Sequence, residues 1–151
     1  MSWNSHITVA CVVEQEGRFL LVEERAGEPG EPLLLNQPAG HWEEGETLQA
    51  AALRETLEES AWEVELTAVL GLYAYKPAHL EYGFLRVAFA ARPLRHHAQR
   101  PLDQGIERAL WLSYTELAAS AARHRSPMVL HAVDDYRAGR RYPLELLSHL
   151  R

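Results

Sequence analysis

Three glutamates lie close together in a segment whose pattern is helical. Glu55, Glu58 and Glu59 are spaced i, i+3 and i+4, which brings their side chains onto an arc of about 100° of a helix. The helical spacing extends from 47 to about 60, and Ala51 and Ala52 of an earlier turn fall within or close to the same arc. This face is therefore expected to be directed at the protein body, where clustered carboxylates can bind a cation or move protons.

Such an arrangement has an energetic cost that a metal would offset. Glu55 and Glu59 are like charges at i, i+4, which destabilises a helix by roughly 0.2–0.5 kcal/mol. Glu58 and Glu59 also lie near the helix C-terminus, where the helix dipole disfavours anions. Arg54 can offset one charge, and a divalent cation can offset the rest. An all-oxygen site suits Mg²⁺ or Mn²⁺ rather than zinc. An acidic, solvated helix face without any site explains the spacing equally well.

The stretch that leads into this helix makes the pattern more specific, because it resembles the Nudix box of the Nudix hydrolases. The matching residues, at fixed spacing, are Gly40, Glu46, Arg54, Glu55, Glu58 and Glu59. The chain has Thr56, Ala61 and Trp62 where the box has an aliphatic residue, a glycine and another aliphatic residue. These three are packing and turn positions. Every charged position of the box is present.

The resemblance implies a fold, an activity and a set of ligands. The fold would be an α/β/α sandwich around a mixed β-sheet. The activity would be the hydrolysis of a small-molecule diphosphate with Mg²⁺ (or Mn²⁺) as cofactor. By position, Glu58 and Glu59 would be metal ligands, together with the backbone carbonyl of Ala39. Glu55 would be a ligand or the base that orients the attacking water, and Arg54 would position these carboxylates.

Residues outside the helix are candidates for contacts with the substrate. Family members often take an additional acid from a later loop, and Glu107 is the catalytic candidate here; a solvated charge at a strand end is the alternative. The arginines can hold a phosphate and Gln37 can bond the organic part, although each can also be a surface arginine or a buried, satisfied amide. Glu46 would support the loop or an outer metal. The candidate substrate-binding residues are Gln37, Gly40, His41, Glu46, Arg86, Arg125 and Arg141.

Four segments outside the box look like the NudJ phosphatase subgroup of this family, namely 8–13, 36–41, 125–127 and 141–145. That subgroup implies release of terminal orthophosphate from nucleoside di- and triphosphates and from thiamine-type diphosphates. Two alternatives stay open: an ADP-ribose or dinucleotide-type pyrophosphatase, and a non-catalytic Nudix module that binds a nucleotide. A module that had lost catalysis should lack carboxylates of the box, and none is missing.

The predicted elements form the scaffold that must position these residues. Strands are expected at 7–13, 18–24, 33–37, 63–75, 82–91 and 107–112, with a polar loop at 93–105. Thr47 is the expected N-cap of the acidic helix. Ser113 and Glu116 form a capping-box signature for a second helix, while Ser126–Pro127 and Gly139 bound a third. This order lacks regular βαβ alternation and predicts a mixed sheet covered by helices on more than one face.

Composition limits the possible classes of protein. The chain has 151 residues, of which 47% are hydrophobic and 24% charged, which predicts a single Nudix domain over 1–151 with the box at 40–62. A net charge of −6 argues against binding to duplex nucleic acid. The longest apolar run, from Ile7, covers about seven residues, so neither a membrane span nor a secretion signal is expected. A single cysteine, Cys11, favours a cytoplasmic location. A monomer or a homodimer is expected.

Overall fold

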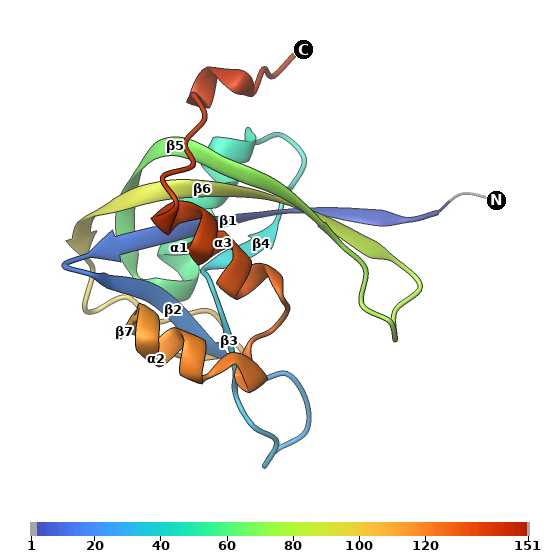
Figure 1. The fold of residues 1–151 in the computed structure, drawn as a ribbon, viewed down its shortest axis with the longest axis vertical. Helices are drawn as coiled ribbons and strands as arrows, with labels where there is room; N and C mark the ends of the chain where they lie inside the picture. Colours follow the sequence, from blue (N-terminus) through green and yellow to red (C-terminus); the bar gives the residue numbers. More distant parts are fainter. Residues whose placement is uncertain (1–2, 151) are drawn as a thin grey trace.

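A computed structural model describes residues 3–150 of the chain (Figure 1). The strands are β1 (Ser5–Gln15), β2 (Arg18–Glu24), β3 (Leu34–Asn36), β4 (Ala39–His41), β5 (Trp62–Tyr75), β6 (Gly83–His96) and β7 (Ile106–Ser113). The α-helices are α1 (Leu48–Ser60), α2 (Tyr114–Ala119) and α3 (Met128–Arg137), and two 3₁₀ turns are η1 (Ala121–Arg123) and η2 (Leu144–Leu146). None of the helices in this range has both the length and the apolar character that a membrane span requires.

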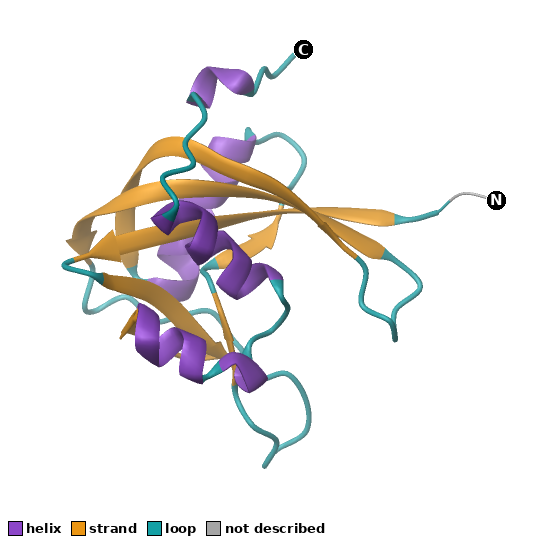
Figure 2. Ribbon diagram, viewed as in Figure 1, coloured by secondary structure: helices purple, strands orange, loops and turns teal. Residues whose placement is uncertain are grey.

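The strands form a mixed sheet in the order β3-β2-β1-β6-β5, with β4 paired to β1 and β7 paired to β2. The pair of β1 and β6 is parallel, in a register that runs from Ser5 opposite Gly83 to Val13 opposite Ala91, and the other pairs are antiparallel. Helix α1 covers one face, while α2 and α3 cover the other (Figure 2). The predicted α/β/α sandwich around a mixed sheet is confirmed.

Strand β1 lies between two hydrophobic cores, and its side chains alternate between them. The core on the α1 side includes Val9, Cys11, Val13, Ala51 and Ala52. On the other side, Val12 packs with Leu117 of α2 and Val129 of α3. A strand buried on both faces has no position left for polar residues, which explains the unbroken apolar run in this part of the sequence.

The ends of α1 and α2 are closed by the predicted side chains. The Thr47 hydroxyl accepts a hydrogen bond from the Ala50 backbone N–H at 3.0 Å. The Ser113 hydroxyl accepts from the Glu116 N–H at 3.1 Å, and the Glu116 carboxylate accepts from the Ser113 N–H at 2.9 Å, which completes the capping box. These bonds fix where each helix starts, and therefore which way the α1 glutamates face.

Helix α3 begins one residue later than predicted, with Pro127 at the cap position and Met128 as the first helical residue. The Ser126 hydroxyl still accepts from the Met128 N–H at 3.2 Å, so the expected serine closes this end of the helix. At the other end, Gly139 has a φ of +85°, as expected of the glycine that follows a helix.

Strand β6 extends to His96, five residues beyond the predicted end, so the loop that was expected from Pro93 starts later. The pairing of β6 with β1 stops at Ala91, and from there β6 has only β5 beside it. Proline is tolerated at such an edge because its missing N–H interrupts no ladder on the open side.

The three departures from the Nudix box are accommodated locally. The hydroxyl of the fully buried Thr56 donates to the Ala52 carbonyl at 2.8 Å. Ala61 ends α1 with a φ of +63°, the left-handed conformation that glycine adopts with less strain. Trp62 packs edge-on against Trp111, with 5.3 Å between the ring centroids. The exit from the helix therefore keeps its shape with a strained alanine.

Candidate active site

A cluster of three carboxylates lies beside the C-terminal half of α1. Oxygen atoms of Glu55, Glu58 and Asp103 all lie within 4.8 Å of one another. Asp103 belongs to the loop between β6 and β7, and its backbone N–H donates to the Glu58 carbonyl at 3.0 Å, which holds this loop against the helix. Three carboxylates at this separation repel one another and offer oxygen ligands for a divalent cation.

Glu59 is adjacent to this cluster and connects α1 to β4. Its carboxylate accepts from the Ala39 backbone N–H at 2.9 Å. Burial raises the pKa of Glu59 to about 8, against the opposing effect of the Ala39 hydrogen bond. Burial likewise raises the pKa of Glu55, against the opposing effect of Arg54. Because of this burial, both carboxylates hold protons more tightly than exposed glutamates do.

Arg54 organises the acidic side of the site. It donates to the Glu46 carboxylate through Nε at 3.0 Å and Nη2 at 2.8 Å, to Glu55 at 2.8 Å and to the His41 carbonyl at 3.1 Å. The bonds to Glu46 raise the pKa of Arg54 above its already high value, so the guanidinium stays charged. The Glu46 carboxylate also accepts from the Glu43 N–H at 2.9 Å, which fixes the loop before α1.

Gly40 lies directly against Glu55. A Cβ atom added to Gly40 would overlap the Glu55 carboxylate, because their separation would be below the 3.0 Å that real Cβ contacts essentially never reach. The absence of a side chain at this position is therefore what leaves room for the carboxylate. The glycine of the box is required here for close approach, and its φ is not in the left-handed region.

Gly40, Glu55 and Glu59 line a cleft of about 660 Å³ between the sheet, the start of α3 and the β5–β6 hairpin, whereas Glu58 and Asp103 are not among its lining residues. The residues that line it come from several strands, α1 and the start of α3, and include Glu24, Asn36, Ala39, Gly40, His41, Glu55, Glu59, Tyr75, Tyr82, Phe84, Arg86, Arg125, Ser126 and Met128. The cleft lining thus contains the carboxylates of Glu55 and Glu59 together with Arg86 and Arg125, of which Arg125 is paired with Glu24. A polyphosphate together with a metal ion has the complementary charges.

Arg86 is the more buried of the two arginines, at 5% exposed. It donates to the Gln37 side-chain carbonyl and to the Asn36 side-chain carbonyl, each at 3.1 Å. The Gln37 side-chain N–H donates in turn to the Val129 carbonyl at 2.8 Å, so both polar groups of this amide are used inside the protein. Gln37 therefore lies under the site and holds Arg86, instead of facing the organic part of a ligand.

The other predicted substrate residues differ in where they lie. His41 lines the cleft, and its Nε2 is hydrogen-bonded to the Nδ1 of His6 at 3.0 Å. Arg125 lines the cleft and pairs with Glu24 at 3.3 Å. Arg141 lies outside the cleft lining, with its guanidinium 4.0 Å above the ring of Tyr136.

Glu107 is also directed away from the carboxylate cluster. Its half-exposed side chain is paired with Arg25, and it is not among the three carboxylates that converge. The acid that comes from a later loop to meet Glu55 and Glu58 is Asp103. The sequence indicates Asp103 only weakly, because it is one of several polar residues in a loop of nine residues. Asn36 accepts a hydrogen bond from Arg86. In the sequence, its position at the end of a short strand was the one feature that indicated a role in the site.

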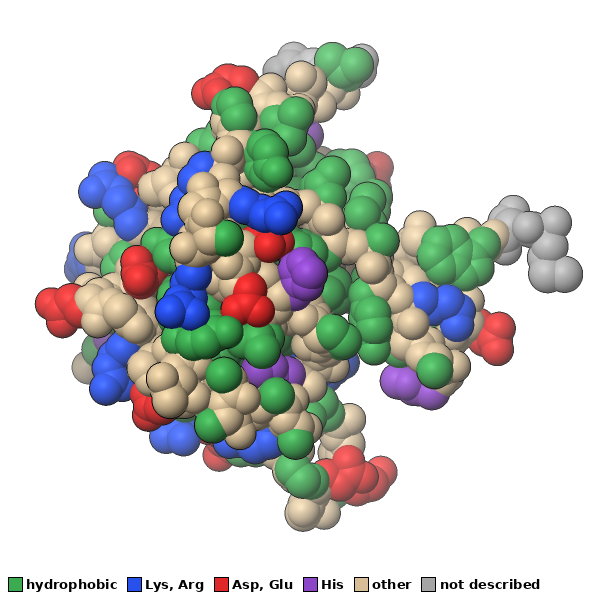
Figure 3. All heavy atoms as spheres, viewed as in Figure 1, with side chains coloured by type: hydrophobic (Ala, Val, Ile, Leu, Met, Phe, Trp, Pro, Cys, Tyr) green, Lys and Arg blue, Asp and Glu red, His purple; other side chains and the backbone are tan. Residues whose placement is uncertain are grey.

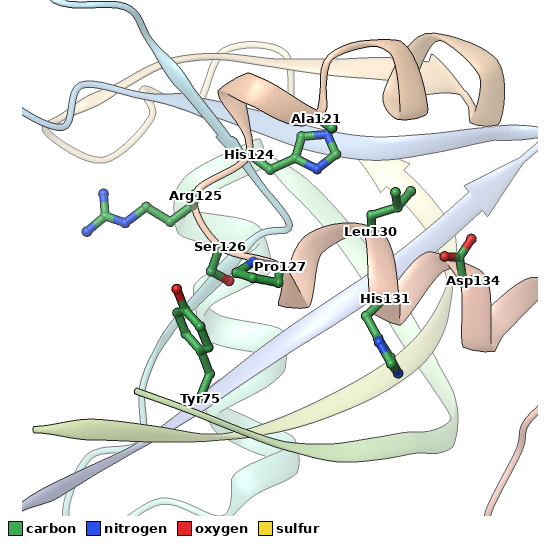
Figure 4. Close-up of a pocket in the computed structure, with 9 residues that line it drawn as sticks. All are labelled: Tyr75, Ala121, His124, Arg125, Ser126, Pro127, Leu130, His131 and Asp134. Atoms are coloured by element: carbon green, nitrogen blue, oxygen red, sulfur yellow. The ribbon is translucent and has the colours of Figure 1, made fainter. Parts of the chain in front are cut away.

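A second, shallower hollow of about 490 Å³ adjoins the cleft and shares Tyr75, Arg125 and Ser126 with it. Figure 4 shows Tyr75 of β5 approaching Ser126 and Pro127 at the start of α3, with His131 and Asp134 projecting from later turns of the helix. On the wider face formed by α2 and α3, acidic, basic and histidine side chains are intermixed (Figure 3). This differs from the continuous basic surface typical of proteins that bind duplex nucleic acid.

Comparison with known proteins identifies the family of this chain. The sequence model of the NUDIX domain matches residues 4–132. The chain belongs to the Nudix family. Phosphatase NudJ of Escherichia coli strain K12 is 39% identical over 143 residues, which cover 95% of this chain and 90% of that protein. A NUDIX hydrolase from Nitrosomonas europaea superposes with a TM-score of 0.93 at 40% identity, covering 97% of this chain and 98% of that one.

A more distant solved structure, the Ap4A hydrolase of C. elegans, shares the fold with a TM-score of 0.66 at 19% identity, over 89% of this chain and 96% of that one. The Nudix resemblance predicted from the box is confirmed. As a Nudix hydrolase, the chain is an enzyme that acts on phosphorus-containing anhydrides. Nudix hydrolases generally use divalent metals, and the cluster of Glu55, Glu58 and Asp103 offers oxygen ligands for one.

Proposed function

We propose that this Nudix hydrolase releases orthophosphate from nucleoside di- and triphosphates and from thiamine-type diphosphates, with Mg²⁺ or Mn²⁺ as cofactor. The observation that carries the proposal is the separation of charge in the cleft. Glu55 and Glu59 of α1 line the cleft, with Glu58 and Asp103 converging on Glu55 beside it, and the buried Arg86 has no carboxylate within ion-pairing distance among the described residues. The similarity to E. coli phosphatase NudJ supports the release of orthophosphate.

The donor set fits a hard divalent cation. Glu55, Glu58 and Asp103 supply carboxylate oxygens within reach of one ion, and Glu59 with the Ala39 backbone lies beside them. Burial raises the pKa of both Glu55 and Glu59, and a bound divalent cation would favour their charged forms. When bound, Mg²⁺ or Mn²⁺ makes water a better nucleophile and neutralises charge that develops on the phosphoryl oxygens.

The side chains of the site have separate roles in binding the substrate and in activating water. Arg54 holds the Glu55 carboxylate in place and stays charged throughout. Arg86 and Arg125 hold the phosphate oxygens, because guanidinium groups match phosphate geometry with two N–H donors. Glu55 or Asp103 accepts the proton of the attacking water, and we assign to Asp103 the place that the family pattern gives to an acid from a later loop.

The test of the activity is a ³¹P NMR spectrum of the products from GTP, thiamine diphosphate and ADP-ribose, recorded with Mg²⁺ and with EDTA. Orthophosphate from GTP or thiamine diphosphate that forms only with Mg²⁺ supports the proposal. Two monophosphates from ADP-ribose would support the second candidate, a pyrophosphatase for dinucleotide-type substrates. The hollow that shares Tyr75, Arg125 and Ser126 with the cleft favours this candidate, because it gives space for a second nucleoside. An unchanged spectrum in both samples would favour a binding module without catalysis.

The assignment of Asp103 has its own test. Asp103→Asn should lower kcat by at least tenfold while the melting temperature changes little, since the substitution keeps the size of the side chain and removes its charge. Glu107→Gln is the matched control, because it removes a carboxylate paired with Arg25 on the surface, and it should keep kcat within threefold. The reverse pattern would return the role to Glu107.

A further inference from the structure

Arg86 is a charged group in an environment that normally requires a counter-ion. Its side chain is 5% exposed, and its Nε–H has no hydrogen-bond partner in the described part of the chain. Burial lowers the pKa of Arg86 to about 10, which leaves it charged at neutral pH. A buried cation without a paired anion is costly for stability, so the position calls for an explanation in terms of function.

The two acceptors that hold Arg86 are neutral amides. Asn36 and Gln37 each accept one N–H bond through a side-chain carbonyl, at 3.1 Å, and Gln37 is fixed from behind by the Val129 carbonyl. A glutamate or an aspartate of the same size at either position would pair with the guanidinium and cancel its charge. The chain therefore has acceptors that orient Arg86 without neutralising it.

The nearest carboxylates are occupied by other groups. Glu24 interacts favourably with the charge of Arg86 from a distance, but its direct partner is Arg125 at 3.3 Å. Glu59 also acts on Arg86 from a distance, while its carboxylate accepts the Ala39 N–H. Arg86 thus lines the cleft with a charge that nothing in its immediate contact compensates.

We propose that Asn36 and Gln37 are positioning residues that keep the Arg86 charge available for the substrate, so that the phosphate group that is not cleaved becomes its missing counter-ion. This inference rests on the proposed function, because it requires a substrate with at least two phosphate groups or a phosphate next to the scissile bond. It also makes the neutrality of the Asn36–Gln37 pair a determinant of affinity for anionic substrates.

The test is the substitution Asn36→Asp, which keeps the oxygen that accepts from Arg86 and adds a negative charge. The KM for GTP or thiamine diphosphate, whichever the ³¹P NMR test shows to be a substrate, should rise at least tenfold, with a smaller change in kcat. The melting temperature should stay the same or rise, because the buried guanidinium gains an ion pair. A purely structural role for Asn36 predicts the opposite, a lower melting temperature with little change in KM. Asn4→Asp adds the same charge at an exposed position outside the cleft and should leave KM within twofold.

A double-mutant cycle separates action through Arg86 from simple repulsion of the substrate. Arg86→Met alone should raise KM at least tenfold, and adding Asn36→Asp to it should raise KM less than threefold further. If Asn36→Asp raises KM by the same factor in both backgrounds, the charge acts directly on the substrate and the inference is overturned. Gln37→Glu adds the charge on the other amide and replaces Asn36→Asp in the cycle if that variant does not fold.

The inference and the proposed function fail in different ways. A wild-type protein that releases no product from any phosphoanhydride with Mg²⁺ or Mn²⁺ overturns the proposed function. A wild-type protein that is active, with Asn36→Asp leaving KM unchanged, overturns only the role of the amide pair. An active protein in which Arg86→Met leaves KM unchanged removes Arg86 from substrate binding, and the amide pair with it.

Discussion

Replacing Gly40 with alanine tests whether the position of the Glu55 carboxylate determines catalysis. The added methyl group would occupy the space that the carboxylate now fills, and ordinary van der Waals contact requires at least 3.4 Å. The carboxylate must therefore move by a distance on the order of 1 Å, and a displacement of that size in a catalytic group costs about 100-fold in rate. In free energy this is about 2.7 kcal/mol of transition-state stabilisation.

The fold should tolerate the same change. The backbone at Gly40 is not in the left-handed region, and the atoms that would be displaced belong to the flexible end of a side chain. Alanine also lowers the entropy of the unfolded chain relative to glycine, which offsets part of the disturbed contact between Glu55 and Arg54. We expect the melting temperature of Gly40→Ala to stay within a few degrees of the wild type.

The assay is the rate of metal-dependent orthophosphate release, measured as kcat/KM together with the thermal unfolding curve. Gly27→Ala is the matched control, because a Cβ atom at Gly27 would meet the Glu31 carboxylate in the same way, in an exposed loop. This control should keep kcat/KM within threefold of the wild type. A Gly40→Ala variant with kcat/KM also within threefold would refute the reasoning, since it would mean that the carboxylate can move without consequence.

Two further predictions concern stability. Ala61→Gly should raise the free energy of unfolding by about 0.5–1 kcal/mol, because it relieves the left-handed conformation at the end of α1; a decrease in urea-induced unfolding experiments would contradict strain at this residue. Glu23→Gln should lower the free energy of unfolding at neutral pH by about 1–2 kcal/mol, because the buried carboxylate accepts from Arg108 and Arg123. Burial alone would raise the pKa of Glu23, but the two guanidiniums hold it below its usual range. The stabilisation is therefore fully present above the unfolded pKa and is lost as the pH falls through the folded value. A difference between the variant and the wild type that did not shrink as the pH falls below the unfolded pKa of glutamate would contradict this linkage.

The parts of the fold that sequence could predict are those set by local rules. The N-cap Thr47 and the capping box at Ser113 depend on residues three positions apart, and both were found as expected. The i, i+3, i+4 spacing of the α1 glutamates likewise determines their common face. The extent of β6 was missed, because Pro93 is acceptable only where β1 no longer pairs with β6, and this depends on a distant strand.

The site residues that sequence reasoning could not place depend on contacts between distant segments. Asp103 reaches the cluster through one backbone hydrogen bond to Glu58, a contact with no local signature. Gln37 was left open between a ligand-binding residue and a buried, satisfied amide, and both polar groups of its side chain are used by Arg86 and Val129. Arg141 was grouped with the other arginines by residue type, whereas the tertiary fold places it on the ring of Tyr136.

Glu59 and Arg86 both line the cleft, yet they do not pair with each other. Glu59 acts on the charge of Arg86 only from a distance, and burial raises the pKa of Glu59 to about 8. The Ala39 N–H holds the Glu59 carboxyl group while Asn36 and Gln37 hold the guanidinium, so the two groups form no ion pair with each other. Folding free energy is lost in keeping them apart. Such a loss is recovered only when the cleft binds a ligand with a cation at one end and an anion at the other, which is the charge distribution of a metal-bound diphosphate.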